Sequence, residues 1–574
     1  MKVSDYIAAY LERQGVTCVF ELSGGMIAHL LDSMGTLKKT QVVSMHHEQA
    51  AAFAAEAYGR MTGVPGVALA TSGPGATNLL TGVGSCFFDS SPAVFITGQV
   101  NRHEQKGSRP IRQLGFQETD IVSMAAPITK AAWKIQTPEE IPEMLDRAFN
   151  LATSGRPGPV LLDIPMDIQR AEIPGLTAAT INAPPPARDL DESFWNRLGE
   201  QMRRAKRPLI LAGGGIRSGQ AVELLRDFAT QSGLPVVHSL MGVDVLPYAH
   251  PLRAGMIGSY GNRWANWAVG HSDFLLVLGS RLDVRQTGSE TESFKSGRII
   301  FHIDCDAGEI NNRILGCESA VCQLKDFLSA GIKKLPAFKL ADHTPWLAEI
   351  KAKRQEWPDT GENPEVTALN PNAFIHRLSQ VSHQAAAYVV DVGQHQMWAA
   401  QSVELTGAQR FLTSGGMGSM GFALPAAIGA SFARPKEPVV MIAGDGAFQC
   451  NIQELQTVKR NQLPLKIVLI NNHCHGMVRQ FQESYFDSRF HSTLWGYSAP
   501  DFVKVAEAYG IPGRRLTHTA EVADALGWLW ADPLTPQVLE VDIASSVNVY
   551  PKMAFGRPIT EMEPFFKPKE MEGT

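Results

Sequence analysis

The sequence predicts an α/β protein of three doubly wound parallel-sheet domains in series, and three observations lead to this prediction. The 574 residues are too many for one hydrophobic core and correspond to about three or four units. Short apolar runs typical of buried parallel strands alternate with helix-like segments along most of the chain. Two stretches without apolar periodicity interrupt this alternation and divide it into three parts.

The first domain is expected to cover residues 1–167. Its helical pattern is clearest in EQAAAFAAEAYGRM, and its strand-like runs are CVFEL, GVALATSG, SPAVFITG and PVLLDIP. The Pro- and Ala-rich stretch TAATINAPPPARD follows, and we interpret it as a linker between domains.

The same alternation occurs twice more. A second domain is expected over 190–335, with the strand-like runs RPLILAGGGI, LPVVHS, DFLLVLGSRL and RIIFHIDCD. A connection with proline and mixed charge is expected around 335–370. The third domain, 370–574, contains AAAYVVDVGQHQ, PVVMIAGDG, LKIVLINN and PQVLEVDI.

Composition excludes several functional classes. The net charge of -5 and the lack of a Lys/Arg run argue against nucleic acid or a membrane surface as a partner. The seven cysteines are scattered, which argues against a disulfide framework, and neither His46 with His47 nor His473 with His475 has standard zinc spacing. With no signal peptide or long apolar run recognised, a cytoplasmic location is expected.

Polar residues end two neighbouring strands of the third domain. Asp445 follows PVVMIAG, Asn472 closes LKIVLIN, and the segment between them is helical in pattern. In such a βαβ unit both residues lie at the same edge of a parallel sheet. Their side-chain oxygens and the backbone carbonyl of Cys474 suit octahedral Mg²⁺, and Gly444 and Gly446 let the backbone approach a phosphate.

Either piece alone is better explained as a turn, because Gly, Asp and Asn are common turn residues. Together, GDG after one strand and NN at the end of the next resemble the motif of the thiamin diphosphate (ThDP) enzymes. These enzymes also need a carboxylate beside the aminopyrimidine ring of ThDP. Glu48 in VVSMHHEQAAAF, at the start of an Ala-rich helix, is the candidate, although a helix-terminal Glu favoured by the helix dipole is the simpler explanation for that residue alone.

Longer motifs are similar to those of the catalytic subunits of acetolactate synthase (acetohydroxyacid synthase). They extend over nearly the whole chain and comprise HHEQAAAFAAEAYGR, SGPGATNLLTG, FQETDIV, SGRPGPVLLDIP, VGQHQMWAAQ, LTSGGMGSMGFALPAAIGA and GDGAFQCNIQEL. The resemblance implies a pyrimidine-binding domain, a central FAD-binding domain and a diphosphate- and Mg²⁺-binding domain. It also implies a homodimer or homotetramer with active sites between subunits.

The resemblance assigns roles to individual positions. Glu48 is implied as the cofactor-activating carboxylate, and Phe116 and Gln117 border the reacting carbonyl. The metal ligands are Asp445, Asn472 and Cys474. The residues implied to hold ThDP are Val392, Gly393, Gln394, His395, Gly418, Met420, Gly444, Gly446 and Ala447.

Five segments of the second domain resemble the FAD-binding segments of the same family: LAGGGIRSG, HSLMG, MIGSYGNRWAN, GSRLDVRQTG and FHIDCD. They imply that Gly214, Arg281, Arg285 and Asp304 contact a structural FAD. A GGG after a strand is weak evidence alone. One departure is VCQLKDF, where the family has Gly-Asp after VC, so an adenine-side contact is expected to be missing.

The chain departs from the family around the expected acceptor pocket, which comprises Met26, Met166, Met477 and Phe481. Met166 replaces a lysine, Phe481 replaces a tryptophan, and ELSGGM has Ser23 for proline and Met26 for a small residue. Loss of the lysine cation makes a neutral aldehyde or ketone acceptor more plausible beside a 2-oxo acid. A ketone of a nucleotide-linked deoxysugar is compatible with these changes.

The sequence therefore predicts a ThDP-dependent carboligase that decarboxylates pyruvate and transfers the acetyl-anion equivalent to a second carbonyl. Two alternatives remain open: a plain 2-oxo-acid decarboxylase, and a catalytically silent flavin-binding scaffold. The FAD-type segments disfavour the first, and the presence of Glu48, Asp445 and Asn472 together disfavours the second. The sequence leaves open the acceptor, the binding of a regulatory subunit, and whether the assembly is a dimer or a tetramer.

Overall fold

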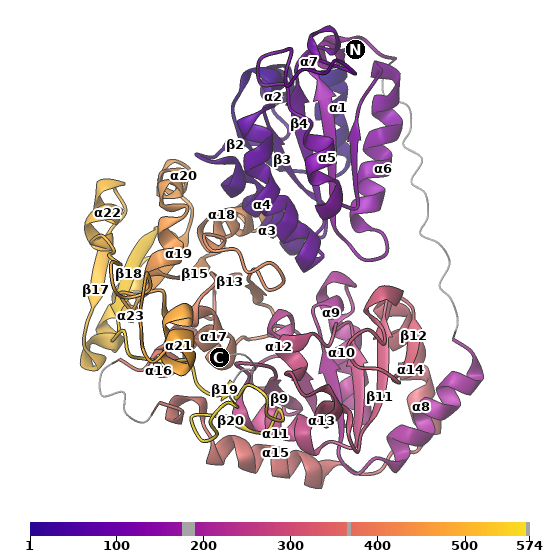
Figure 1. Cartoon of the computed structure of the whole chain (residues 1–574), viewed down its shortest axis with the longest axis vertical. Coiled ribbons are helices and arrows are strands. Elements are labelled where there is room, and N and C mark those ends of the chain that lie inside the picture. Colours follow the sequence, from indigo (N-terminus) through magenta and orange to yellow (C-terminus); the bar gives the residue numbers. More distant parts are fainter. Residues whose placement is uncertain (175–189, 364–368, 570–574) are drawn as a thin grey trace.

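A computed structural model of the chain describes residues 1–174, 190–363 and 369–569. Three six-stranded parallel sheets, each with helices packed around it, form three lobes (Figure 1). The predicted α/β class with three doubly wound sheets is therefore confirmed. The predicted linker TAATINAPPPARD lies outside the described residues.

The N-terminal sheet has the strand order β2-β1-β3-β4-β6-β5, and all its pairs are parallel. Its strands are β1 (Cys18–Leu22), β2 (Gln41–Ser44), β3 (Gly66–Ala70), β4 (Ala93–Gln99), β5 (Ala131–Lys134) and β6 (Pro159–Pro165). Its helices are α1 (Val3–Arg13), α2 (Ala28–Leu37), α3 (Glu48–Thr62), α4 (Pro74–Asp89), α5 (Ile121–Ala125), α6 (Ile141–Thr153) and α7 (Met166–Arg170).

The central sheet has the order β12-β11-β10-β7-β8-β9. Its strands are β7 (Pro208–Ala212), β8 (Val236–His238), β9 (Arg253–Met256), β10 (Phe274–Leu278), β11 (Ile299–Asp304) and β12 (Glu318–Val321). Its helices are α8 (Glu192–Arg204), α9 (Gly215–Ser218), α10 (Val222–Ser232), α11 (Arg263–His271), α12 (Val284–Thr287), α13 (Thr291–Lys295), α14 (Leu324–Phe338) and α15 (Thr344–Glu356).

The C-terminal sheet, β14-β13-β15-β16-β18-β17, repeats the topology of the N-terminal sheet. Its strands are β13 (Ala387–Val390), β14 (Arg410–Leu412), β15 (Val439–Gly444), β16 (Leu465–Asn471), β17 (Gly513–Leu516) and β18 (Gln537–Asp542). Its helices are α16 (Pro371–Val381), α17 (Gln394–Ser402), α18 (Ala423–Ala433), α19 (Asp445–Gln449), α20 (Leu455–Arg460), α21 (Gly476–Tyr485), α22 (Phe502–Ala508) and α23 (Val522–Trp530).

Helices α3 and α18, which occupy equivalent places in the two sheets' topology, pack directly on each other and join the outer domains (Figure 1). Both are rich in alanine, and a Cβ at Gly429 would lie 2.0 Å from the backbone oxygen of Ala54, so the two backbones approach more closely than any larger residue allows. The rings of Phe53 and Phe422 meet edge to face at 5.4 Å. The apolar core is therefore continuous between these two domains.

Two features differ from a simple series of domains. The connection expected around 335–370 contains α15, whose buried Trp346 and Ile350 pack beside the central domain. After the third sheet, the antiparallel pair β19 (Lys552–Met553) and β20 (Met562–Glu563) returns to the central domain, where Arg263 donates to the backbone oxygen of Glu563 at 2.9 Å. None of the helices in the described ranges is long and apolar enough to cross a membrane.

Candidate functional site

The carboxyl edge of the C-terminal sheet brings together the residues predicted to hold a metal ion. Gly444 at the end of β15 is in register with Ile470 of β16, so Asp445 and Asn472 follow neighbouring parallel strands. Both side chains are buried. Tyr497 donates its hydroxyl to Oδ2 of Asp445 at 2.8 Å, while burial raises the pKa of the Asp445 carboxyl above its ordinary value.

Three oxygen atoms converge at this edge when the Asn472 amide is oriented so that its Nδ2 donates to Oε1 of Gln394 at 2.8 Å. Oδ1 of Asn472 lies 3.2 Å from Oδ1 of Asp445 and 2.8 Å from the backbone oxygen of Cys474. The donor found nearest to Oδ1 of Asn472 within the described chain is the Cys474 amide at 3.4 Å, a long contact. Oxygens this close repel one another unless a cation lies between them. Because neighbouring oxygens around octahedral Mg²⁺ lie about 2.9 Å apart, these three fit a magnesium ion.

The loop after β13 supplies the residues expected to contact a diphosphate. His395 is buried, its Nε2 atom has no partner among the described residues, and burial lowers its pKa to about 3. Gly393 and Gly444 flank this neutral ring: a Cβ on either would lie within 3 Å of it. We call the carboxyl edge of the C-terminal sheet, where Asp445 and Asn472 lie, the metal edge. A ring nitrogen without a hydrogen-bond partner beside this edge could donate to an oxygen of an anionic ligand.

Asp391 is a residue of this site that the sequence analysis missed. Its carboxylate accepts the backbone N–H groups of Val392 at 2.8 Å, Gly421 at 3.0 Å and Ala423 at 2.8 Å. Burial raises its pKa to about 6, although these donors act in the opposite direction. Asp391 thereby ties the loop after β13 to the segment that carries Gly418 and Met420. The signal that the sequence offered was an aspartate at the end of an apolar strand-like run, in AYVVDVGQ.

A second missed residue, Asp89, holds the Gly418 segment from the N-terminal domain. The Asp89 carboxylate accepts the backbone N–H of Gly415 at 3.0 Å and that of Gly416. Met420 follows these two hydrogen bonds in the chain, and this residue is 38 % exposed. The segment is thus fixed at its base and leaves an apolar side chain accessible to a ligand.

Glu48 begins α3, as predicted, and is buried. Its Oε2 accepts Nδ2 of Asn78 at 2.9 Å, and its Oε1 accepts no hydrogen bond within the described chain. A Cβ at Gly75 would lie 3.1 Å from this Oε1, so the glycine leaves room beside it. One carboxylate oxygen is therefore held while the other remains available to an external donor.

Phe116 and Gln117 lie near the loop that leads to α4. Gln117 has a left-handed backbone with φ of 66°, and a Cβ at Gly73 would lie 2.9 Å from the Gln117 Cβ. Phe116 is 79 % exposed, which is unusual for a large aromatic side chain. The N-terminal domain thus gathers Gln117, Gly73 and Glu48 at one edge, with strain of the kind found at functional sites.

The four residues of the predicted acceptor pocket do not meet in one chain. Met26 and Met166 belong to the N-terminal domain, where Nε2 of Gln169 on α7 donates to the Met26 backbone oxygen at 2.8 Å. Met477 and Phe481 lie on α21, far from α7 in Figure 1. Phe481 is 41 % exposed. A pocket made of all four would need a second copy of the chain.

A cavity of about 1060 Å³ lies between the three domains. It brings together Gly214, Arg281, Arg285 and Asp304 from the central domain, and Val392 and Gly418 also line it. The strand order of the central sheet places β7 beside β10 at its switch point, where doubly wound folds bind dinucleotides. A Cβ at Gly213 would lie 2.0 Å from the Gly279 backbone oxygen, so the two strand-end loops touch there.

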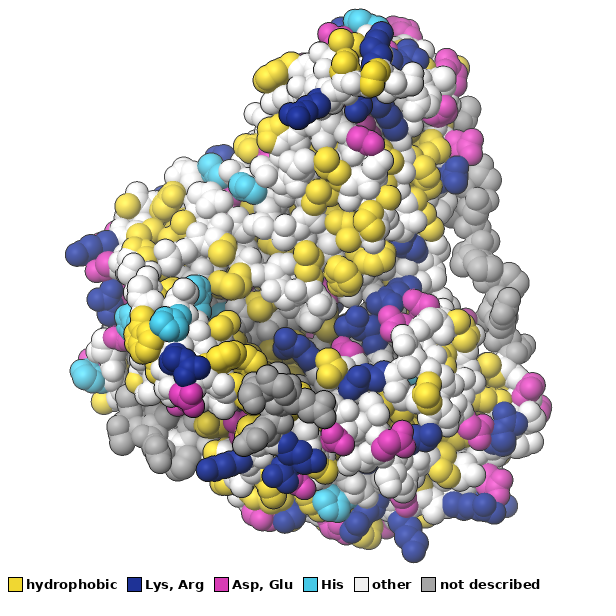
Figure 2. All heavy atoms as spheres, in the orientation of Figure 1, with side chains coloured by type: hydrophobic (Ala, Val, Ile, Leu, Met, Phe, Trp, Pro, Cys, Tyr) yellow, Lys and Arg dark blue, Asp and Glu magenta, His cyan; other side chains and the backbone are white. Residues whose placement is uncertain are grey.

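Charge around this cavity suits a phosphorylated ligand. Lys and Arg side chains gather around the hollow between the N-terminal and central domains in Figure 2. Arg217 and Arg410 both pair with Asp244 at 3.0 Å, and Arg281 pairs with Asp283 at 3.1 Å. No ion pair is found for Arg285 within the residues described. The cavity therefore offers both neutralised and unpaired guanidinium groups to an anion.

Comparison with known proteins agrees with this arrangement. Patterns of the thiamine pyrophosphate enzymes match the N-terminal TPP binding domain at residues 1–124, the central domain at 196–330 and the C-terminal TPP binding domain at 391–541.

The chain is also similar to curated proteins over nearly its whole length. It is 37% identical to the acetolactate synthase isozyme 2 large subunit of Escherichia coli (strain K12), over 98% of this chain and 99% of that protein. It is 36% identical to the acetolactate synthase large subunit of Lactococcus lactis subsp. lactis (strain IL1403), over 97% and 95%. Acetolactate synthase 2, chloroplastic, of Nicotiana tabacum is 38% identical, over 97% and 84%.

Proposed function

The chain belongs to the acetolactate synthase family of thiamine pyrophosphate enzymes, and from this premise we propose that it is a ThDP-dependent carboligase acting on pyruvate. It would remove CO₂ from the donor and join the remaining two-carbon unit to a second carbonyl compound. The observation that carries the proposal is the set of three oxygens that meet at the ends of β15 and β16 when the Asn472 amide nitrogen faces Gln394, because such a set suits a cation.

ThDP, when bound, supplies the electron sink that decarboxylation of a 2-oxo acid requires. The chain's own residues bind and orient it. We assign Asp445, Asn472 and the Cys474 carbonyl to Mg²⁺, and the loop of His395 to the diphosphate. Glu48 would hydrogen-bond the aminopyrimidine ring through its free Oε1, and Asn78 would keep the carboxylate in place. The apolar side chain of Met420 would pack against the ThDP molecule.

We propose that FAD occupies the cavity between the three domains and has a structural role. The strand order of the central sheet, the close approach of Gly213 to Gly279 and the guanidinium groups of Arg281 and Arg285 support this assignment. The Ser414–Gly418 segment lines the cavity and leads to Met420. A flavin there would therefore also brace a wall of the ThDP site.

We further propose that the enzyme works as a homodimer or a homotetramer. Two observations support a second copy: α7, which carries Met166, lies far from α21, which carries Met477 and Phe481 (Figure 1), and the Phe116 side chain is largely exposed. A second copy that brings its α21 to the N-terminal domain would complete the acceptor pocket. The acceptor is a 2-oxo acid, a ketone or an aldehyde, including a keto-sugar, and Met166 in place of a lysine favours the uncharged acceptors.

The activity can be tested by incubating the protein with pyruvate, ThDP and Mg²⁺ and identifying the products over a panel of acceptors. Acetolactate, free acetaldehyde, or pyruvate consumption only with an added ketone or aldehyde would each identify one reaction. Glu48→Gln is expected to lower every rate at least about a hundredfold, because it removes the acid–base partner of the cofactor. Glu143→Gln, on an exposed turn of α6, is the matched control. A Glu48→Gln rate within twofold of wild type would refute the mechanism.

A further inference from the structure

A chain of three side-chain amides runs from the backbone of Val549 to the metal edge. It begins at Gln480 on α21, whose side chain is buried. The backbone N–H of Val549 donates to Oε1 of Gln480 at 2.9 Å, and Nε2 of Gln480 donates to the Val549 oxygen at 3.0 Å. A reversed Gln480 amide would place donor against donor and acceptor against acceptor. Its orientation is therefore fixed by the main chain.

Gln394 and Asn472 follow in sequence from that fixed end. Nε2 of Gln394 donates to Oε1 of Gln480 at 3.2 Å, which leaves Oε1 of Gln394 turned toward Asn472. That oxygen accepts Nδ2 of Asn472 at 2.8 Å. The other end of the Asn472 amide, its oxygen, must then face Asp445 and Cys474.

The reversed orientation of the Asn472 amide would gain hydrogen bonds on one side and lose one on the other. It would let the amide nitrogen donate to Oδ1 of Asp445 at 3.2 Å and to the Cys474 oxygen at 2.8 Å. It would also place the amide oxygen 2.8 Å from Oε1 of Gln394, acceptor against acceptor. Without a cation, an unrestrained Asn472 would thus favour the reversed orientation, which presents N–H groups where a cation must bind.

Gly476 gives separate support for this contact. A Cβ at this position would lie 2.0 Å from Oε1 of Gln394 and 2.5 Å from Nδ2 of Asn472. Its φ is not in the left-handed region, so the glycine is needed for space and not for an unusual backbone. The backbone at the start of α21 thus leaves the room in which the two amides meet.

We propose that Gln480 and Gln394 are positioning residues, which hold the Asn472 amide with its oxygen toward the cation before the cation arrives. The inference rests on the proposed Mg²⁺ site and names two residues that do not touch the ion in this role. The family resemblance also implies that Gln394 contacts ThDP, and an Asn472→Asp background separates that contact from the positioning role. Pre-orientation raises cation affinity because no fraction of the enzyme is lost to the reversed amide.

The test is a Mn²⁺ titration of the full-length, metal-stripped protein with excess ThDP, in which electron paramagnetic resonance counts the free Mn²⁺. Gln480→Leu breaks the first link and Gln394→Met breaks the last. Each is expected to raise the Mn²⁺ Kd about ten- to a hundredfold, the effect of one hydrogen bond that involves a charged site. Both side chains are buried, so either variant could fail to fold; Gln394→Met, which keeps an unbranched side chain of similar length, decides the question if Gln480→Leu does not fold.

An Asn472→Asp background provides the control. Both terminal atoms of this side chain are oxygens, so no orientation has to be fixed, and Oε1 of Gln394 then faces a carboxylate oxygen. In this background Gln480→Leu and Gln394→Met are expected to leave the Mn²⁺ Kd unchanged or to lower it. A merely structural role would raise the Kd equally in both backgrounds and would overturn the inference.

The remaining outcomes separate the two proposals. If wild type binds Mn²⁺ but both variants stay within twofold of its Kd, the positioning role is wrong while the cation site stands. If wild type shows no saturable Mn²⁺ binding, the proposed cation site is wrong and the inference falls with it.

Discussion

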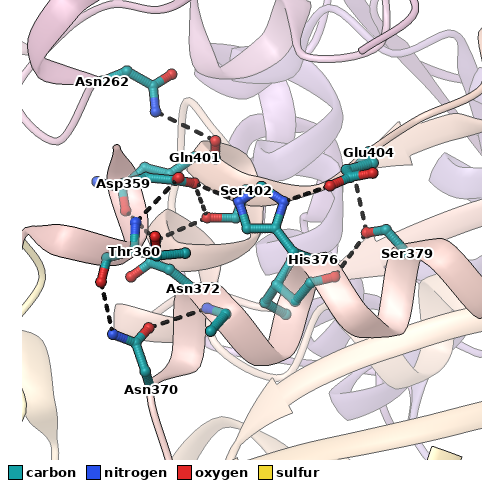
Figure 3. Close-up of polar contacts among 12 residues, drawn as sticks. Asn262, Asp359, Thr360, Asn370, Asn372, His376, Ser379, Gln401, Ser402 and Glu404 are labelled. Carbon is teal, nitrogen blue, oxygen red and sulfur yellow. Dashed lines mark hydrogen bonds and ion pairs between the residues drawn. The ribbon is translucent and has the colours of Figure 1, made fainter. Parts of the chain in front are cut away.

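Two buried polar clusters in and beside the C-terminal domain contain carboxylates, yet one has a donor or an opposite charge for each carboxylate and the other leaves oxygen atoms facing one another. In the first, shown in Figure 3, the His376 ring lies between Asp359 and Glu404. Its Nε2 is 2.9 Å from Oδ2 of Asp359, and its Nδ1 is 2.7 Å from Oε1 of Glu404. Ser402 also donates to Asp359 at 2.5 Å, and Asn372 donates to Ser402 at 2.9 Å. Every charge in this His376 cluster has an opposite charge or a donor beside it.

The oxygens at the ends of β15 and β16 face one another instead. Asp445 has a donor for one carboxylate oxygen, from Tyr497, while its other oxygen faces the Asn472 amide oxygen. Reversal of the Asn472 amide would remove this repulsion. The hydrogen bonds from Gln394 to Gln480 and from Asn472 to Gln394 disfavour that reversal. We call the His376 cluster closed, because its charged groups find partners within the chain, and the set of oxygens from Asp445, Asn472 and Cys474 open, because these oxygens face one another. A closed cluster stabilises the fold by itself, whereas an open one is suited to bind a group from outside the chain.

Asp445→Asn is the largest expected effect, because it removes the only carboxylate of the oxygen set. Mg²⁺ affinity in the presence of ThDP should fall on the order of a thousandfold, beyond the 10- to 100-fold typical of changes around a ligand. The new amide can donate to the Asn472 oxygen, so the free energy of unfolding without Mg²⁺ should stay equal or rise. Isothermal titration calorimetry and urea unfolding measure the two quantities. A large loss of metal-free stability would show that Asp445 serves the fold.

Asp359→Asn makes the same chemical change in the closed cluster and should give the reverse result. The Asp359 side chain is almost fully buried and carries the ion pair to His376. Its loss should lower the free energy of unfolding by about 2 to 3 kcal/mol. Mg²⁺ affinity should not change. If Asp359→Asn weakened Mg²⁺ binding as strongly as Asp445→Asn, the distinction between the clusters would fail.

The sequence predicted the open cluster and missed the closed one for a physical reason. Asp445 and Asn472 follow two strands joined by a short helical connection that contains α19 and α20, so parallel pairing alone brings them to one edge. The residues of the His376 cluster come from a connection, from α16, from the end of α17 and from Glu404 just after it, and only tertiary packing brings them together. Asp391, Asp89 and Gln480 were missed for the same reason, since their partners are distant in the chain.

The three-domain α/β fold could also be predicted, because buried parallel strands have a strong apolar pattern. Helix α15 could not be predicted, because its sequence contains a proline and mixed charges, which are typical of a connection between domains. For the acceptor residues, sequence similarity assigned one pocket to two pairs of positions that a single chain keeps apart, one pair at α7 and the other on α21 (Figure 1). Similarity between sequences does not distinguish contacts within a chain from contacts between copies.

The pH dependence of stability gives the smallest expected effect and tests the closed cluster alone. Burial lowers the pKa of His376, but the hydrogen bonds and charges of Asp359 and Glu404 outweigh it, and the net result is a raised pKa. The native state therefore keeps a proton that the unfolded chain releases. This stabilisation is complete below the unfolded pKa, about 6.5, and is lost as the pH rises through the higher folded pKa.

For one such group the free energy of unfolding falls by at most about 1.4 kcal/mol per pH unit across that window. Tyr248, whose ring is 5.9 Å from that of His376, stays uncharged there, because burial raises its pKa above the ordinary value of about 10. Urea unfolding from pH 6 to 9 should show the decline in wild type and lose it in His376→Gln. Metal affinity should be identical in both proteins at each pH, because within the described residues no hydrogen bond links the His376 cluster to the oxygens of Asp445 and Asn472. A decline that persists in His376→Gln would mean that another group releases the proton, and the closed cluster would then owe its stability to packing rather than to charge.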